Sequence, residues 1–507
     1  MTFIRFSIRF FAFRQSALML TLSLGLGGLG ISQASHANYT AAPIRAGFSE
    51  THINRLIAEW SLQQVNGGMP QIHDPWVVDT IYRITNQMNV SVRSQSLIAT
   101  PVINDNSINA FAVPGGLIAI NTGTILSSKS LDEPVSVLAH EVAHLSQRHY
   151  EHTKDEKGKL LAMQVGGFVA ALAAAVAGSG DAALAMMAGS QTAAADTAAA
   201  GSREHEREAD RVGMQILANN GYDARAMPRF FGRLHQQTQL NQYDGAFIPS
   251  FVRSHPFTTE RLSEATARAN SHPAVSALAK QQQAISFDML YWRLQYLSKQ
   301  ATFTELSAAA KHSTGAKLAL AAWLSDHARF DDAKALLTQL NALPSTNKQS
   351  LEPLLCITNA HVYYQQKAYN QALEHIESCQ RVYPERRDLK IYLADTLIYA
   401  GRPIEAQALL KPLTDNTPHD IKAWDLTQKS YQMLANTSTD NNIRELSSIH
   451  ALRSRGYVEL WSARYDSALT SLTQAKNLAE QNPKYRTLAA LLDKDLATVQ
   501  TYKNFKP

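Results

Sequence analysis

Apolar residues between positions 48 and 123 follow two different spacings. Within 48–66 and within 75–88 they recur at helical intervals, which predicts two amphipathic helices. Residues 96–103 and 109–123 form short apolar runs instead, which predicts strands. Pro114-Gly115-Gly116 divides the second run in two. This part of the chain is therefore expected to hold a small sheet beside helices.

Further helices are predicted downstream. Apolar positions over 131–150 keep a helical spacing, and Asp132 and Glu133 lie in the first turn, where the helix dipole favours acidic groups. The charged segment 203–220 is another predicted helix, and Gly221 ends it as a C-cap. Helices are also predicted over 227–237 and up to about residue 269.

After about residue 288 the pattern becomes a series of helical hairpins with a repeat. Ala372 and Ala406 are 34 residues apart, and so are Pro384 and Pro418. A small Ala lets the two helices of a hairpin approach each other, and a Pro ends the second helix. The pattern resembles tetratricopeptide repeats, and an irregular helical bundle is the alternative. In four hairpins an Ala stands three positions after the turn residue, which is Phe330, Tyr369, Pro403 or Tyr465.

Length and composition describe a globular protein of more than one domain. A chain of 507 residues is too long to fold around a single core. Its net charge of +5 is mild and forms no concentrated basic stripe, so nucleic acid is not an expected partner.

The N-terminus has the layout of a secretory signal peptide. Arg5, Arg9 and Arg14 precede an apolar run over 17–31, and small residues lead up to a cleavage point near Ala37. A retained membrane anchor is the alternative, but the run is short and rich in Gly for a spanning helix. Residues 1–37 are therefore predicted to be removed on export.

The chain has two cysteines, Cys356 and Cys379. In an oxidising compartment an isolated pair is a disulfide candidate. Cys356 would begin one helix of a hairpin and Cys379 would end the antiparallel helix, so both are expected at the same end and close enough to bridge.

The segment His140-Glu141-Val142-Ala143-His144 lies within the predicted helix 131–150. Two histidines four positions apart share one helix face, where both imidazoles can bind a single Zn²⁺. The intervening Glu141 can act as the general base that takes a proton from the attacking water. The alternative is a helix with two partly buried histidines.

A catalytic zinc needs a third protein ligand, and the helix 203–220 supplies the candidates. Helical periodicity places Glu206 and Asp210 on the face that carries most small and apolar residues. One of them would ligate the metal and the other would orient a ligand imidazole. Asp210 could instead be a surface charge paired with arginine. The candidates considered for the third ligand are Glu204, His205, Glu206 and Glu208.

Residues 157–201 form an Ala-rich insert between the two ligand segments. Its length allows a transmembrane hairpin, but polar residues and glycines interrupt it. The favoured hypothesis is two small-residue helices that pack over the active site or contact a membrane or an apolar client. Ordinary core helices are the plainest alternative.

Two further motifs resemble those of the zinc metallopeptidase family that includes the CAAX prenyl proteases and the HtpX heat-shock proteases. The first is Asn109-Ala-Phe-Ala-Val-Pro-Gly-Gly116, before the metal helix, and the second is Ser202-Arg203-x-x-Glu206-x-x-Ala209-Asp210. The resemblance implies that Glu206 is the third ligand and Asp210 its support. It also implies that His255, in Ser254-His255-Pro256, lies near the metal and occupies its fourth position at rest.

The resemblance completes a domain scheme and a mainly α fold class. A zincin-type α+β peptidase domain with a small sheet is expected over 38–270, a linker over 271–287 and an α-helical repeat solenoid over 288–507. An extended peptide is expected to add to an edge strand formed by Leu117, Ile118, Ala119, Ile120 and Asn121. Arg261 or His255 is expected to stabilise the oxyanion.

The arrangement of a signal peptide, the peptidase motifs and C-terminal repeats most resembles that of periplasmic members of this family that serve outer-membrane β-barrel assembly. The resemblance implies a zinc endopeptidase that degrades misfolded outer-membrane proteins and contacts the assembly machinery through its repeats. A scaffold or chaperone with a silent or self-blocked metal site is the alternative. A membrane-embedded protease would require the insert 157–201 to span the bilayer.

Overall fold

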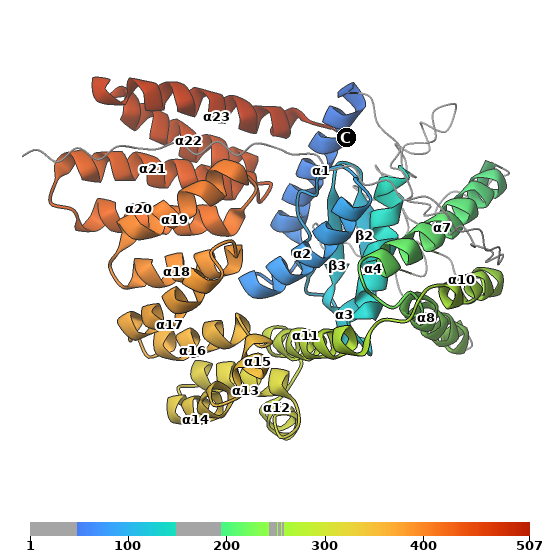
Figure 1. The fold of residues 1–507 in the computed structure, drawn as a ribbon. Helices are drawn as coiled ribbons and strands as arrows, with labels where there is room; N and C mark the ends of the chain where they lie inside the picture. The colour runs from blue at the N-terminus through green and yellow to red at the C-terminus, as the bar shows by residue number, and fades with distance from the viewer. Residues whose placement is uncertain (1–47, 149–193, 243–250, 252–254, 256–257, 507) are drawn as a thin grey trace, which may run out of the picture. The chain divides into compact units, whose positions relative to one another are not determined.

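The fold is known from a computed structural model of the chain, which describes residues 48–148, 194–242, 251, 255 and 258–506. It is mainly α-helical, as the sequence predicts, with one small sheet (Figure 1). The predicted signal peptide and residues 157–193 of the Ala-rich insert lie outside the described residues. Within the described residues no helix combines the length and the apolar character that crossing a membrane requires.

The sheet has three strands in the order β1-β3-β2. β3 pairs in parallel with β1 and antiparallel with β2. The expectation that 117–121 forms an edge is therefore wrong: β3 is central because partners pair along both of its sides. The two edges are β1, which Gln71 bridges on its outer side, and β2. The strands are β1 (Val102–Ile103), β2 (Ala110–Val113) and β3 (Leu117–Asn121).

Helices surround this sheet, and α4 (Asp132–Ser146) lies between the sheet and helices α2, α7 and α8. Every residue of α4 is buried. An all-round buried helix is the mark of a core element, so the His and Glu side chains that α4 carries are held rigidly. The other helices of this part are α1 (Phe48–Gly68), α2 (Pro75–Ser91), α3 (Thr122–Leu126), α7 (Ala194–Asn219), α8 (Ala226–Gln242) and α10 (Thr259–Ser271).

Most of the remaining helices form antiparallel hairpins. Phe330, Tyr369, Pro403 and Tyr465 each begin the second helix of a hairpin, as the repeat pattern predicts. Helices α13 to α19 are α13 (Thr314–Asp326), α14 (Phe330–Asn341), α15 (Ser345–Gln349), α16 (Leu354–Gln365), α17 (Tyr369–Val382), α18 (Arg387–Tyr399) and α19 (Pro403–Asn416). They are preceded by α11 (Ala277–Leu297) and α12 (Phe303–Ala309), and followed by α20 (Ile421–Thr437), α21 (Asn441–Leu460), α22 (Tyr465–Glu480), η1 (Pro483–Tyr485) and α23 (Arg486–Asn504).

Two details concern the expected domain scheme. Helix α11 begins at Ala277, so the second part of the segment expected as a linker, 271–287, is helical. Cys356 of α16 and Cys379 of α17 form a disulfide with a Cα–Cα distance of 6.4 Å. It joins the two helices of one hairpin at the same end.

The repeats pack directly against the helices around the sheet. Asp74, the N-cap of α2, accepts hydrogen bonds from Arg293 of α11 and Tyr392 of α18, both at 2.7 Å. Arg387 donates to Asp79 of α2 at 2.7 Å and to Asp420 at 2.6 Å. The contacts made by Asp74 and Asp79 join segments more than 200 residues apart in the sequence.

Candidate metal centre

Helix α4 brings the first two candidate ligands together. His140 and His144 are 0% and 4% exposed, and their Nε2 atoms lie 3.0 Å apart. The rings meet edge to face with centroids 4.6 Å apart. One helical turn separates the two residues, so the helix itself sets this approach.

Helix α7 supplies the carboxylate. Glu206 is buried, and its Oε2 lies 3.3 Å from His140 Nε2 while its Oε1 lies 3.5 Å from His144 Nε2. Glu204 is exposed and His205 is half-buried, so the face that periodicity favoured is the face that reaches the histidines. Gly213 allows the approach, because a Cβ there would lie 3.3 Å from the His140 backbone.

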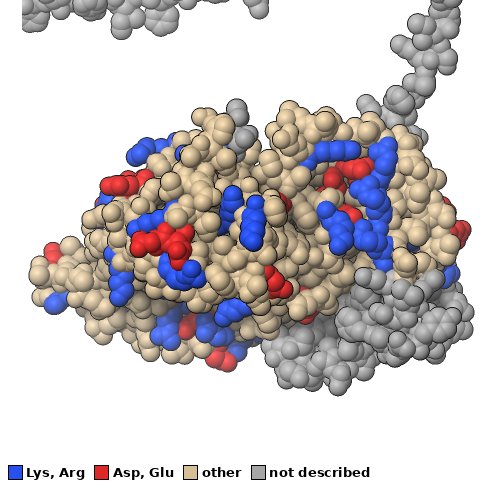
Figure 2. All heavy atoms as spheres, turned by 90° about the horizontal axis from the view of Figure 1, so that it is seen from below, with Lys and Arg blue, Asp and Glu red and all other residues tan. Residues whose placement is uncertain are grey.

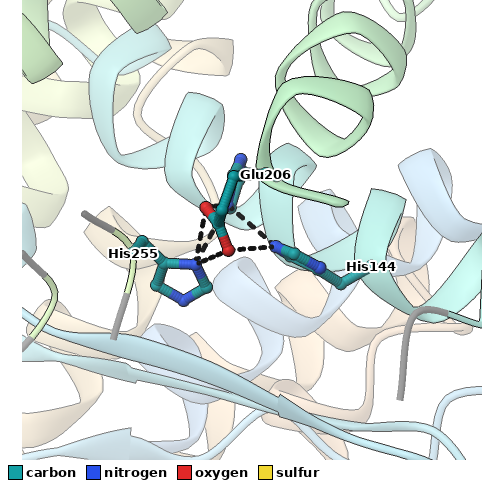
Figure 3. Close-up of side chains that lie close together, drawn as sticks. His144, Glu206 and His255 are labelled. Atoms are coloured by element: carbon teal, nitrogen blue, oxygen red, sulfur yellow. Dashed lines mark hydrogen bonds and ion pairs between the residues drawn. The ribbon is translucent and has the colours of Figure 1, made fainter. Parts of the chain in front are cut away.

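His255 closes the cluster from a segment between α8 and α10. Its Nδ1 lies 2.9 Å from Glu206 Oε1 and 3.3 Å from His140 Nε2. Figure 3 shows Glu206 between His144 and His255, with both rings directed at the carboxylate. The ring of Phe251 packs on His255 with centroids 4.7 Å apart. Without the family resemblance, the sequence would have left this histidine as a loop residue.

Asp210 and Arg261 support the ligands from behind. Asp210 Oδ1 lies 3.1 Å from His140 Nδ1, the ring nitrogen that faces away from Glu206. Arg261 of α10 donates from Nε and Nη2 to Asp210 at 2.5 and 2.9 Å, and its Nη1 lies 2.9 Å from Glu206 Oε2. The guanidinium thus orients both carboxylates. Two acids on a buried helix face were the signal that a buried cation was required.

The charges of the cluster compensate one another. Burial raises the pKa of Glu206, but the neighbouring histidines, His255 foremost, hold it well below its usual value. Burial likewise opposes ionisation of Asp210, and Arg261 nevertheless lowers its pKa. Burial would lower the pKa of His140, but hydrogen bonds to Asp210 and Glu206 raise it to about 9. Positive charge from the neighbouring histidines and from Arg261 therefore compensates the two buried carboxylates.

Glu141 has a different environment from Glu206. It is 0% exposed, and burial raises its pKa, while His255 and His140 oppose the rise. His255 Nε2 lies 3.5 Å from Glu141 Oε1, and the backbone N–H of Ala112 in β2 faces the carboxylate. A carboxylate whose pKa is raised toward neutrality is suited to accept and return a proton.

The four ligand atoms fit a divalent metal ion. Those of His140, His144, Glu206 and His255 all lie within 4.8 Å of one another. Tetrahedral bonds of about 2.1 Å to zinc place neighbouring ligand atoms about 3.4 Å apart. The separations of 3.0, 3.3 and 3.5 Å among the first three residues match that spacing. Two imidazoles and one carboxylate are a donor set that zinc hydrolases use.

Comparison with known families agrees with this geometry. Residues 72–269 match the model of peptidase family M48, and residues 363–429 match a tetratricopeptide repeat model. The matched M48 segment contains all four clustered residues, Glu141 and the sheet. The chain is therefore a metalloprotease with an M48 peptidase domain followed by tetratricopeptide repeats.

The chain is also similar to individual bacterial proteases. The chain is 26% identical over 438 residues to the beta-barrel assembly-enhancing protease of Escherichia coli K12, covering 83% of each chain. A Vibrio cholerae protein that carries the same name provisionally is 28% identical over 432 residues. The match covers 83% of this chain and 84% of the Vibrio cholerae chain. The protease HtpX of Yersinia enterocolitica is 29% identical over 150 residues, 27% of this chain and 48% of its own.

Proposed function

We propose that the chain is a periplasmic zinc endopeptidase that removes misfolded or stalled outer-membrane proteins. The observation that carries the proposal is the buried cluster of His140, His144 and Glu206 with Glu141 one position from the first histidine. Zinc bound there would polarise a peptide carbonyl and acidify a water molecule. Glu141 accepts the proton of that water and returns it to the leaving amine.

His255 has a separate role in this proposal. Its Nδ1 lies at ligand spacing from Glu206 and His140, so with a metal bound it would hold, at rest, the fourth position that a substrate carbonyl requires. When the substrate displaces it, the ring stays near the oxyanion and can donate a hydrogen bond. The resting enzyme is then self-blocked until an extended chain enters.

The substrate adds to β2 rather than to β3. Asn121 donates to Asn109 at 3.0 Å, so alternation along the antiparallel pair directs the backbone groups of Ala110 and Ala112 away from β3. The N–H of Ala112 already faces Glu141. A peptide paired here through its main chain passes the catalytic residues whatever its side chains are, which suits unfolded clients.

The setting and partners rest on other observations. The name of the Escherichia coli relative couples a protease with β-barrel assembly. The predicted signal peptide and the disulfide suit an oxidising compartment such as the periplasm. The repeats would recruit the assembly machinery or its stalled clients. Figure 2 shows acidic and basic side chains interspersed on one face rather than a field of one sign, which suits protein partners.

Glu141→Gln tests the catalytic assignment. The amide keeps the shape of the side chain but cannot take a proton, so cleavage of an unfolded outer-membrane protein should fall by about 10²–10⁴-fold. Zinc content and the unfolding midpoint should stay at wild-type values. Glu204→Gln, which alters an exposed carboxylate of α7, is the matched control and should cleave normally.

The alternative proposal is a scaffold of outer-membrane assembly with a silent site. Equal cleavage by wild type and Glu141→Gln, or wild-type protein purified without zinc, would overturn the catalytic assignment. A Glu141→Gln protein that fully supports outer-membrane assembly in cells, beside a wild type that cleaves nothing, would favour the scaffold.

A further inference from the structure

A histidine of the last repeats forms a hydrogen bond with the peptidase-domain segment that packs against the β2–β3 turn. His419, between α19 and α20, donates from Nε2 to the carbonyl of Ile98 at 2.7 Å. Burial lowers the pKa of His419, so the neutral ring with its proton on Nε2 makes this bond. The ring meets Trp461 edge to face with centroids 5.7 Å apart. A side chain of the repeats thus contacts the backbone of the sheet region directly.

The segment that His419 holds is part of the sheet's support. The Ile98 N–H donates to Gly116 at 2.6 Å, and the Ile118 N–H donates to Ala99 at 3.3 Å. Gly116 has a φ of +100°, and a Cβ there would lie 2.3 Å from the Ser96 carbonyl oxygen. The turn that joins β2 to β3 therefore rests against this segment without space between them.

Helix α1 supports the same turn from another side. A Cβ on Gly115 would lie 1.9 Å from the carbonyl oxygen of Asn54 in α1. The repeats hold α1 in turn: Tyr465 donates to Gln63 at 2.7 Å, and Tyr502 of α23 donates to Glu59 at 2.7 Å. Figure 1 shows α1 close to α23. One apolar core joins these parts and includes Ala58, Leu62, Ile98, Val113, Leu117, Leu460 and Trp461.

We propose that the C-terminal repeats position the β2–β3 hairpin, and with it the substrate-accepting edge, and that His419 is a positioning residue for peptide binding. The proposal rests on the proposed peptidase function. The chain of contacts runs from His419 through Ile98 and Gly116 to β2, which faces Glu141. A protein that docks on the last repeats can then alter peptide binding at the active site without touching it.

Replacing His419 tests the coupling. His419→Leu removes the donor and keeps an apolar side chain, while the Nε2 of His419→Gln can still reach the Ile98 carbonyl. With an unstructured peptide as substrate, His419→Leu should raise KM by about threefold to tenfold, because binding must now order a looser edge. The kcat should stay within about twofold, since Glu141, His140 and His144 sit on α4 and Glu206 sits on α7. His419→Gln should restore KM.

Hydrogen exchange measured on the same proteins gives a readout that does not need activity. The amides of Ile98 and Ile118 should exchange faster in His419→Leu than in wild type, and His419→Gln should restore their protection. His375 stacks on Tyr363 inside one repeat hairpin, with centroids 5.1 Å apart. His375→Leu is therefore the matched control and should change neither KM nor these amides.

The outcomes separate the two proposals. If wild type cleaves nothing, faster exchange at Ile98 and Ile118 still supports the coupling. Unchanged exchange and unchanged KM in a folded His419→Leu overturn it, and so does an equal rise of KM in His375→Leu. If His419→Leu fails to fold, Tyr465→Phe replaces it: loss of the bond to Gln63 should raise KM by about twofold, and an unchanged KM overturns the coupling.

Discussion

Arg261 shows how one residue organises the metal centre without belonging to it. Its side chain is 5% exposed and lies against Asp210 and Glu206. A planar guanidinium can serve two carboxylates at once, because its donors point in fixed directions. Asp210 in turn orients the His140 ring, and Glu206 is held facing the histidines. The geometry of these two ligands, His140 and Glu206, therefore depends on a residue of a third helix, α10.

Arg261→Lys should therefore weaken metal binding although the charge is kept. An ammonium cannot make the three contacts of the guanidinium, so Asp210 and Glu206 lose their fixed orientation. Supporting contacts of this kind contribute about 10–100-fold to metal affinity. Competition with a chelator measures the change. Arg268→Lys, an exposed substitution on the same helix, should bind zinc as wild type does; an equal loss there would contradict the role given to Arg261.

His450 makes the stability of the repeats depend on pH. Burial, with Arg453 nearby, lowers its pKa from 6.5 to about 4. Because the unfolded chain takes up this proton first, stability is fully present above the unfolded pKa of 6.5 and is lost as the pH falls toward 4. The loss should reach about 2–3 kcal/mol at the acid end. His450→Phe keeps the ring against Tyr431 and should remove this part of the acid sensitivity.

Urea unfolding of wild type and His450→Phe, compared at about pH 8 and about pH 5, measures the effect. The difference between the two proteins should be larger at the acid pH, in favour of the variant. A difference that stays constant between the two pH values would contradict the assignment.

At the scale of the element, the approach of α7 to α4 decides whether a metal site forms. A helix buried on all sides cannot move to accommodate a partner, so the partner must present a small residue where the backbones meet. Gly213 is that residue, with Met227 and the His140 backbone at its surface. Its position one and two turns beyond Asp210 and Glu206 sets how far these acids reach.

Gly213→Ala should destabilise the protein and loosen the site. The added Cβ would lie 3.0 Å from Met227 Cε and 3.3 Å from the His140 backbone, so α7 must shift away. We expect a loss of about 1–3 kcal/mol in unfolding free energy and weaker zinc binding. Gly232→Ala in α8 is the control, because its Cβ would meet only Leu262 at 3.8 Å. It should be neutral or stabilising by up to about 1 kcal/mol.

At the scale of the whole molecule, buried ion pairs make the peptidase domain and the repeats one structural unit. Asp74 is buried between α2, α11 and α18, and Arg293 and Tyr392 both donate to it. Burying a charge lowers the stability of the fold little while its oppositely charged partner is present, and much when the partner is removed. The repeats therefore do more than carry a docking surface: they complete the burial of the peptidase domain's helices.

Asp74→Asn should destabilise the peptidase domain and the repeats together. The amide can still cap α2, but it leaves the Arg293 charge buried without its carboxylate, at a cost of about 3–5 kcal/mol. Urea unfolding followed by tryptophan fluorescence should show one transition at a lower midpoint. Asp415→Asn breaks the exposed pair with Lys411 and should cost less than about 1 kcal/mol. Equal effects of the two substitutions would contradict the proposed joint.

Local patterns in the sequence were sufficient for most helices, the repeats and three of the clustered residues. Helical spacing places His140, Glu141 and His144 on one segment and sets Glu206 on a buried face, because these relations lie within a turn or two of chain. The hairpin beginnings at Phe330, Tyr369, Pro403 and Tyr465 are likewise local. Residues close together in the sequence are sufficient to determine which face of a helix is buried and where a turn ends.

Only the tertiary structure decided the relations between distant segments. The order of the strands makes β2 an edge and β3 the centre, and alternation within either strand could not reveal that. Arg261 meets Asp210, and His419 meets Ile98, across 51 and 321 positions of sequence. Such contacts depend on how whole elements pack, and a local pattern states which face is buried but not what it is buried against.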